Sequence, residues 1–158
     1  MWTLPVISTK VPHVPNYRAE IRTTRPQEEV FDYLARFSSV AEWDASVVSA
    51  EMLTREPVEA GSEFKVVVRS FGRELPFVYR VSTFDRPHVV TLVADTGRLR
   101  SEDTITVEPD GDGTTVVYDA CLTAKGVARL ANPLLAVSLR RIGDAAAAGL
   151  RAVITSAA

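Results

Sequence analysis

Residues 110–155 read DGDGTTVVYDACLTAKGVARLANPLLAVSLRRIGDAAAAGLRAVIT, and this stretch predicts a glycine turn, a strand and one long helix. Apolar and polar residues alternate through 114–123, which is typical of a strand with one buried face. From 127 to 155 the apolar residues recur at the helical period and form one stripe, while the four arginines of this segment fall on the opposite side. A helix of this length, roughly 40 Å at about 1.5 Å per residue, needs a large apolar surface to lie on. We expect the preceding strands to supply that surface.

Two features of the long helix leave alternatives open. Pro133 either starts the main helix, with Asn132 as its cap, or kinks a helix that begins at Val127. The small residues at 145–149 either bring the helix and the sheet close together or leave room for a ligand.

Upstream of this stretch, the chain alternates between short strand patterns and turns. Residues 17–23 predict a half-buried strand, and the apolar spacing in 26–43 predicts two short helices. Further strands are predicted at 47–54, 63–70, 74–83, 89–94 and 99–107, separated by turns rich in glycine or proline. Because successive strands are joined by short turns, we expect an antiparallel sheet. The sequence therefore predicts an α+β fold with seven strands.

The register of two hairpins follows from the sequence. Pairing Ser70 with Arg73 places one set of side chains on a common inward face: Phe64, Val66, Val68, Leu75, Phe77 and Tyr79. Pairing Val107 with Val116 in the later hairpin places Ile105 opposite Tyr118 and Asp103 opposite Ala120. Both hairpins then direct polar groups toward the apolar interior.

Length and composition restrict the class of protein. The chain has 158 residues, which suits one domain at 16–158, preceded by an extended N-terminal arm at 1–15. The net charge of −2 and the scattered arginines predict no nucleic-acid partner. Cys121 is the only cysteine, so no internal disulfide is expected. Without a signal-peptide pattern or an apolar run of about 20 residues, we expect a cytoplasmic protein with no membrane span.

The order of elements resembles the helix-grip superfamily, which includes START domains, Bet v 1-like proteins and bacterial polyketide cyclase/dehydrase (SRPBCC) proteins. The matching segments are PQEEVFDYLARFSSVAEW (26–43), GSEF (61–64), DGTTV (112–116) and the closing helix, and the resemblance covers about residues 16–155. It implies a helix-grip fold, in which a curved seven-stranded antiparallel sheet surrounds a long C-terminal helix, with two short helices after the first strand. It also implies an apolar cavity between sheet and helix. Superfamily members carry lipids, bind hormones or steroids, cyclise polyketides or act as partner proteins, so function must be argued from the site.

The residues expected to line the cavity lie on inward strand positions, on the apolar stripe of the long helix and at the end of the short helices. They are Trp43, Phe64, Val66, Val68, Phe77, Tyr79, Asp103, Ile105, Tyr118, Leu134, Leu135, Ser138 and Ile142. Asp103 is the candidate catalytic residue, because a carboxyl group among apolar side chains has a raised pKa and can act as a base. The alternatives for Asp103 are a shift of the strand that turns it to the other face, or a salt bridge to Arg98 or Arg100 near the rim.

The sequence predicts neither a metal site nor a cofactor, because His13 and His88 have no partner at ligand spacing. The first hypothesis is a carrier or sensor of a small apolar molecule: a lipid, a polyketide or an aromatic compound. The second is an enzyme of the cyclase/aromatase type, a lyase or dehydratase that uses Asp103 with Tyr79 and Tyr118. The third is a protein-interaction or regulatory module with a vestigial cavity. We favour a binding protein over an enzyme, and the sequence leaves the oligomeric state open.

Overall fold

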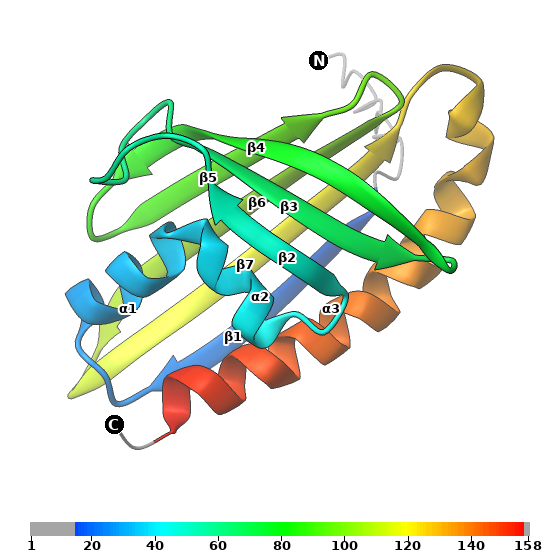
Figure 1. Cartoon of the computed structure of the whole chain (residues 1–158). Helices are drawn as coiled ribbons and strands as arrows, with labels where there is room; N and C mark the ends of the chain where they lie inside the picture. Colours follow the sequence, from blue (N-terminus) through cyan, green and yellow to red (C-terminus); the bar gives the residue numbers. More distant parts are fainter. Residues whose placement is uncertain (1–14, 157–158) are drawn as a thin grey trace, which may run out of the picture.

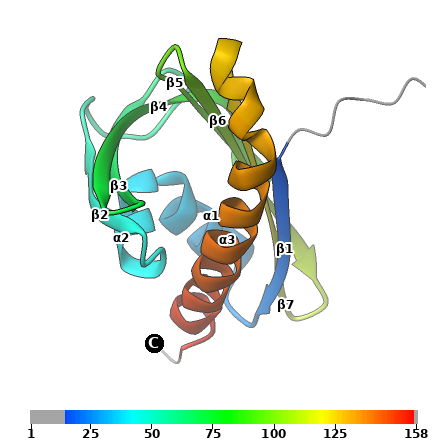
Figure 2. The same cartoon turned by 90° about the vertical axis from the view of Figure 1, so that its right-hand side faces the viewer.

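The computed structural model describes residues 15–156, so the arm expected at 1–15 lies almost wholly outside the described residues. The strands are β1 (Asn16–Thr23), β2 (Val47–Met52), β3 (Glu63–Ser70), β4 (Arg73–Asp85), β5 (Val89–Asp95), β6 (Leu99–Asp110) and β7 (Gly113–Ala124). They form one seven-stranded antiparallel sheet in the order β1-β7-β6-β5-β4-β3-β2 (Figure 1). The sheet curls around the long helix α3 (Asn132–Thr155), as Figure 2 shows. The predicted helix-grip fold is confirmed.

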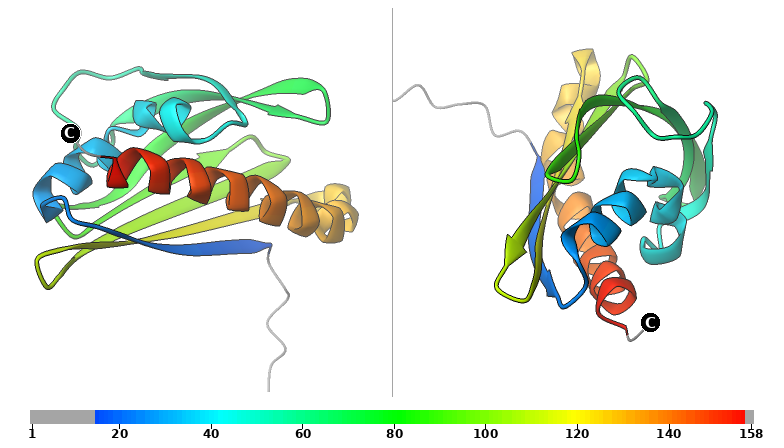
Figure 3. Two further views of the ribbon diagram at one scale, coloured as in Figure 1. Left: turned by 90° about the horizontal axis from the view of Figure 1, so that it is seen from below. Right: turned by 90° about the vertical axis from the view of Figure 1, so that its left-hand side faces the viewer.

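The connection between β1 and β2 carries short helices, as predicted. These are α1 (Gln27–Ala35), a 3₁₀ turn η1 (Phe37–Ser39) and α2 (Val40–Trp43). They cover the concave side of the sheet beside the C-terminal half of α3 (Figure 3). Between residues 15 and 156, no helix is both long and apolar enough to cross a membrane.

Both hairpin registers predicted from the sequence are confirmed. Ser70 pairs with Arg73 in the β3–β4 hairpin, and Val107 pairs with Val116 in the β6–β7 hairpin. At the tip of the β3–β4 hairpin, Phe71 has φ 50° and Gly72 has φ 74°. Two residues with positive φ give the turn type whose twist matches that of the flanking strands.

The long helix begins later than the apolar pattern predicted. A 3₁₀ helix, η2, occupies Gly126–Ala131, and α3 then starts with Pro133 in its first turn, where a missing N–H removes no helical hydrogen bond. Asn132 does not cap the helix. Its Oδ1 accepts a hydrogen bond from the Ala124 N–H at 3.1 Å and so ties the start of α3 to the end of β7. Of the two alternatives, Pro133 starts the main helix, and the side chain of Asn132 has a different role.

Small residues bring the C-terminal half of α3 into close contact with its neighbours. A Cβ added at Gly149 would lie 2.0 Å from the Trp43 carbonyl oxygen, and one at Gly143 would lie 2.5 Å from the Tyr17 ring. Ala146 is buried between these two positions. Gly149 therefore serves close packing, whereas Gly143 and Ala146 also border a cavity between the sheet and the helix.

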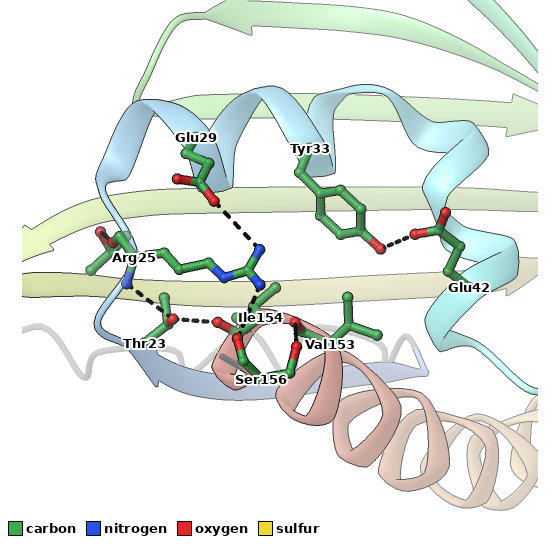
Figure 4. Close-up of polar contacts among 9 residues, drawn as sticks. Thr23, Arg25, Glu29, Tyr33, Glu42, Val153, Ile154 and Ser156 are labelled. Atoms are coloured by element: carbon green, nitrogen blue, oxygen red, sulfur yellow. Dashed lines mark hydrogen bonds and ion pairs between the residues drawn. The ribbon is translucent and has the colours of Figure 1, made fainter. Parts of the chain in front are cut away.

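Polar contacts at the end of β1 hold the C-terminal end of α3 (Figure 4). The Thr23 hydroxyl donates to the Ile154 carbonyl and accepts a hydrogen bond from the Arg25 N–H at 3.2 Å. The Arg25 guanidinium donates to the Ser156 carbonyl at 3.0 Å and pairs with Glu29 at 3.4 Å. These donors satisfy carbonyl groups that a helix end leaves without intrahelical partners.

Candidate functional site

A cavity of about 300 Å³ lies between the concave face of the sheet and the N-terminal part of α3. Its walls are mainly apolar: Val68, Leu75, Phe77, Leu99, Ala120, Leu122, Leu135, Leu139, Ile142 and Ala146. Phe71, in the β3–β4 turn, also lines the cavity and is 72% exposed, so it marks the side on which the cavity opens.

Four buried polar side chains form a hydrogen-bonded chain in the cavity wall. The Tyr79 hydroxyl donates to Ser101 Oγ at 3.0 Å, and Ser101 Oγ donates to Asp103 Oδ1 at 3.3 Å. The Tyr118 hydroxyl donates to Asp103 Oδ2 at 2.9 Å. Strand alternation explains this grouping, because Ser101 and Asp103 are two residues apart on β6 and so share its inward face. Asp103 is 5% exposed.

Burial dominates the acid–base properties of these hydrogen-bonded side chains. It raises the pKa of Asp103 to about 7, although the hydrogen bonds from Tyr118 and Ser101 act in the opposite direction. A carboxyl group with this pKa can accept and release a proton near neutral pH. Burial also raises the pKa of Tyr79 and of Tyr118 well above the ordinary value, so both hydroxyls keep their protons.

The alternative role for Asp103, a salt bridge at the rim, does not occur in the structure. Arg100 instead pairs with Glu102 at 3.1 Å and lies 4.0 Å from Asp95. No basic side chain within residues 15–156 forms an ion pair with Asp103. Its negative charge is therefore compensated by hydroxyl donors alone.

Asp44 brings a second carboxyl group to the cavity. It lies in the loop after α2, where its Oδ1 accepts hydrogen bonds from the Ser46 N–H at 2.8 Å and the Ser46 hydroxyl at 2.7 Å. Burial raises the pKa of Asp44, while the Ser46 hydrogen bonds lower it. The charge of Asp44 in turn raises the pKa of Asp103. The cavity thus combines two electrostatically coupled carboxyl groups with apolar walls.

Comparison with known proteins assigns the chain to a family. Residues 15–155 match the family described as polyketide cyclase / dehydrase and lipid transport. The chain belongs to this family. A search of curated proteins found no match.

Solved structures share the fold over nearly the whole chain. A Thermus thermophilus protein has 21% identity and a TM-score of 0.73, over 89% of this chain and 97% of that one. A START superfamily protein from Mycobacterium smegmatis has 14% identity and a TM-score of 0.72, over 88% and 96% of the two chains. The Zhui aromatase/cyclase from a Streptomyces species has 12% identity and a TM-score of 0.72, over 90% and 94%. The resemblance stated from the sequence is confirmed, and at these identities the likeness establishes the fold alone.

The structure brings part of the predicted site together around the cavity. The predicted residues that line it are Val68, Phe77, Tyr79, Asp103, Tyr118, Leu135 and Ile142. Phe64, Val66 and Ile105 share the inward face but lie in the buried core rather than in the cavity wall. The buried ring of Phe37 packs against Phe64 in this core, with the two ring centroids 6.4 Å apart.

The remaining predicted residues lie outside the cavity wall. Trp43 is buried, and its ring packs edge to face against Tyr118 with centroids 5.7 Å apart. Leu134 is 58% exposed in the first turn of α3, and Ser138 is half-buried. A helical wheel places both on the apolar side of α3. However, the buried residues of this helix all lie at position 143 or later, so its first turns are not covered by the rest of the protein.

Two polar residues of the cavity were not predicted from the sequence, Ser101 and Asp44. Ser101 could have been found, because it lies two residues before Asp103 on the same strand and so shares its face. Asp44 gave no such signal, since it follows α2 in a loop where no periodicity assigns a direction. Across the described part of the chain, no three or more His, Cys, Asp or Glu side chains are grouped so as to hold a metal ion.

Proposed function

We propose that this protein binds a small apolar molecule, such as an aromatic compound, a polyketide or a lipid, in the cavity between the sheet and α3. The observation that carries the proposal is a cavity of about 300 Å³ with mainly apolar walls and a few hydrogen-bonding groups. This combination is typical of small-molecule sites, which range over about 300–1,000 Å³. The volume lies at the lower end of that range, which favours a compact ligand over a long acyl chain.

A matched pair of arginine substitutions tests the proposal. Leu135 lines the cavity and is half-buried, whereas its neighbour Leu134 is 58% exposed and lies outside the wall. In Leu135→Arg the aliphatic stem can follow the cavity wall while the charged head reaches water at the opening. We expect this variant to fold and to bind the neutral dye N-phenyl-1-naphthylamine at least about tenfold more weakly, a loss of about 1.4 kcal/mol. Leu134→Arg should bind the dye as the parent does.

Fluorescence titration, circular dichroism and thermal melts on the three proteins give distinct outcomes. A folded Leu135→Arg that binds the dye at parental strength would contradict the placement of the ligand. An unfolded Leu135→Arg beside a folded Leu134→Arg would mean a close-packed interior, because a buried unpaired charge costs several kcal/mol. A parent protein that binds no dye, and whose organic extract holds no small molecule by mass spectrometry, would refute the function.

Asp103 favours a second candidate function, an enzyme of the cyclase/aromatase type. With a pKa of about 7, its carboxylate can take a proton from the carbon between two carbonyl groups of a β-keto chain. The resulting carbanion forms a bond to another carbonyl carbon of the same chain, and the proton returns to the new alkoxide oxygen. Loss of water from that alcohol then gives the unsaturated ring.

Asp103→Asn distinguishes the enzyme from the binding protein. Asparagine preserves the shape of the side chain and removes the titrating group. For an enzyme, the variant should bind N-phenyl-1-naphthylamine normally but fail to convert a poly-β-keto thioester, followed by absorbance of the aromatic product. Turnover that survives Asp103→Asn at the parental rate would exclude this mechanism.

A further inference from the structure

The charged side chains that face the cavity are all acidic. Asp44 and Asp103 both line it, and no arginine, lysine or histidine of residues 15–156 does so. Neither carboxyl group has an ion-pair partner in the described part of the chain. A ligand in this cavity therefore meets negative potential from two directions: strand β6 and the loop after α2.

Asp44 and Asp103 can both accept further hydrogen bonds from a ligand. Each oxygen of Asp103 accepts one hydrogen bond, from Ser101 and from Tyr118, although a carboxylate oxygen can accept two. For Asp44, both hydrogen bonds from Ser46 go to Oδ1. The hydroxyls of Tyr79, Ser101 and Tyr118 already donate within the wall, so beside Asp103 a ligand finds acceptors more readily than donors.

Aromatic rings supply an independent reason for the same preference. Phe77, Tyr79 and Tyr118 line the same cavity as the two carboxyl groups, and the rings of Phe77 and Tyr79 lie 6.2 Å apart, centroid to centroid. The face of an aromatic ring carries partial negative charge and attracts cations. Rings and carboxylates together form the environment that recognises an ammonium group on an apolar body.

We propose that the cavity selects an apolar molecule that carries a protonated amine, and that it discriminates against carboxylate ligands such as fatty acids. This inference rests on the proposed binding function and narrows the class of ligand. An ammonium group would donate to the free lone pairs of Asp103 and Asp44, while its apolar body would lie along Leu135, Leu139 and Ile142. A carboxylate placed there would be desolvated beside two like charges with no cation to compensate it.

The affinity for the amine should also increase with pH. The groups that face Asp103 are Tyr118 from β7, Tyr79 from β4 by way of Ser101, and Asp44 from the loop after α2. Because the pKa of Asp103 is raised to about 7 by burial, its attraction for a cation is weak at pH 5.5 and strong at pH 8. We expect the amine to bind several-fold more tightly at pH 8 than at pH 5.5.

Three ligands with one ring system test the inference on the unmodified protein. 1-Naphthylmethylamine is cationic, 1-naphthylmethanol is neutral and 1-naphthoic acid is anionic at pH 7.5. We expect the amine to displace N-phenyl-1-naphthylamine at a concentration at least about tenfold lower than the alcohol, and the acid to be weaker still. Asp103→Asn and Asp44→Asn should each reduce the advantage of the amine. Asp119→Asn removes a carboxylate outside the cavity, paired with Arg18, and should leave the order unchanged.

The outcomes separate this inference from the function on which it rests. If the dye binds and the alcohol or the acid matches the amine, the preference for an amine is refuted while ligand binding stands. If the dye and all three naphthalenes fail to bind, the proposed function itself is refuted. An amine preference that survives in Asp103→Asn, Asp44→Asn and Asp119→Asn alike would also overturn the inference, because its cause would lie outside the two cavity carboxylates.

Discussion

Replacing Asp103 with asparagine separates the cost of burying a carboxylate from the hydrogen bonds that the side chain makes. In Asp103→Asn, the Tyr118 hydroxyl can still donate to the amide oxygen, and the amide NH₂ can donate to Ser101 Oγ. The arrangement of the hydrogen-bonded side chains in the cavity wall is therefore kept. The variant loses only the ability of this side chain to ionise, and Asp103 is 5% exposed in the parent protein.

The direction of the pH dependence follows from the two states of Asp103. Its pKa rises from the ordinary value of 3.8 to about 7 in the native state, mainly through burial. Between these values the native protein holds a proton that the unfolded chain has released, so the free energy of unfolding falls as pH rises. The two pKa values differ by about 3, and each unit is worth about 1.4 kcal/mol. We therefore expect the ionisation of Asp103 to cost the parent on the order of 4 kcal/mol at pH 8 and almost nothing at pH 4.

Urea unfolding of parent and variant between pH 4 and pH 8 measures this cost. We expect the two to agree within about 1 kcal/mol at pH 4, and Asp103→Asn to be more stable by as much as about 4 kcal/mol at pH 8. Asp119→Asn is the matched control. It breaks a partly exposed ion pair with Arg18, so it should lose less than about 1 kcal/mol and gain nothing at high pH. A difference for Asp103→Asn that stays flat across the pH range would show that this carboxyl group is solvated, and would refute the reasoning.

Three further substitutions test the packing and the polar contacts. Gly149→Ala places a methyl group 2.0 Å from the Trp43 carbonyl oxygen and should lower the free energy of unfolding by about 1–3 kcal/mol; an unchanged thermal melt would contradict the close approach of α2 and α3. Tyr118→Phe removes a donor that lowers the pKa of Asp103, so that pKa should rise; a titration of the carboxyl carbon by NMR that moves down instead would exclude the hydrogen bond. Thr23→Val leaves the last turn of α3 without its hydroxyl donor and should cost about 1 kcal/mol, with faster amide exchange there; unchanged exchange would assign the contact no role.

The sheet could be predicted because its signals are local and consistent with one another. In the β6–β7 hairpin, alternation fixes which side chains share a face, and the glycine turn fixes which residues are opposite. These two constraints leave one register, in which Asp103 lies opposite Ala120. A shift by one residue would move Asp103 to the solvent face together with every apolar neighbour. The inward direction of the candidate catalytic residue thus follows from the same pattern that predicts the strand.

Positions along α3 could not be predicted in the same way. A helical wheel gives the direction of Leu134 and Leu150 around the axis, but not how far along the axis the rest of the molecule extends. Leu150 is 1% exposed and Leu134 is 58% exposed on the same predicted stripe. The role of Gly149 was equally undetermined, because the sequence does not state which element approaches it. Asp44 depends on the path of a loop, which follows from the packing of α2 against α3 rather than from any repeating pattern.

The free-energy cost of ionising the buried Asp103 side chain bears on the role of this residue in the cavity. A loss of about 4 kcal/mol is large against the 5–15 kcal/mol by which domains are usually stable, and asparagine would make similar hydrogen bonds without it. Stability alone would then favour asparagine at this position, and both proposals give the aspartate a use that asparagine lacks, as a negative charge or as a transferable proton. The two proposals for this site use these properties differently: an ammonium ligand is held by the charge, and a cyclisation step uses the proton. In Asp103→Asn the first loses affinity for naphthylmethylamine, and the second loses turnover while dye binding remains, so the same variant tells them apart.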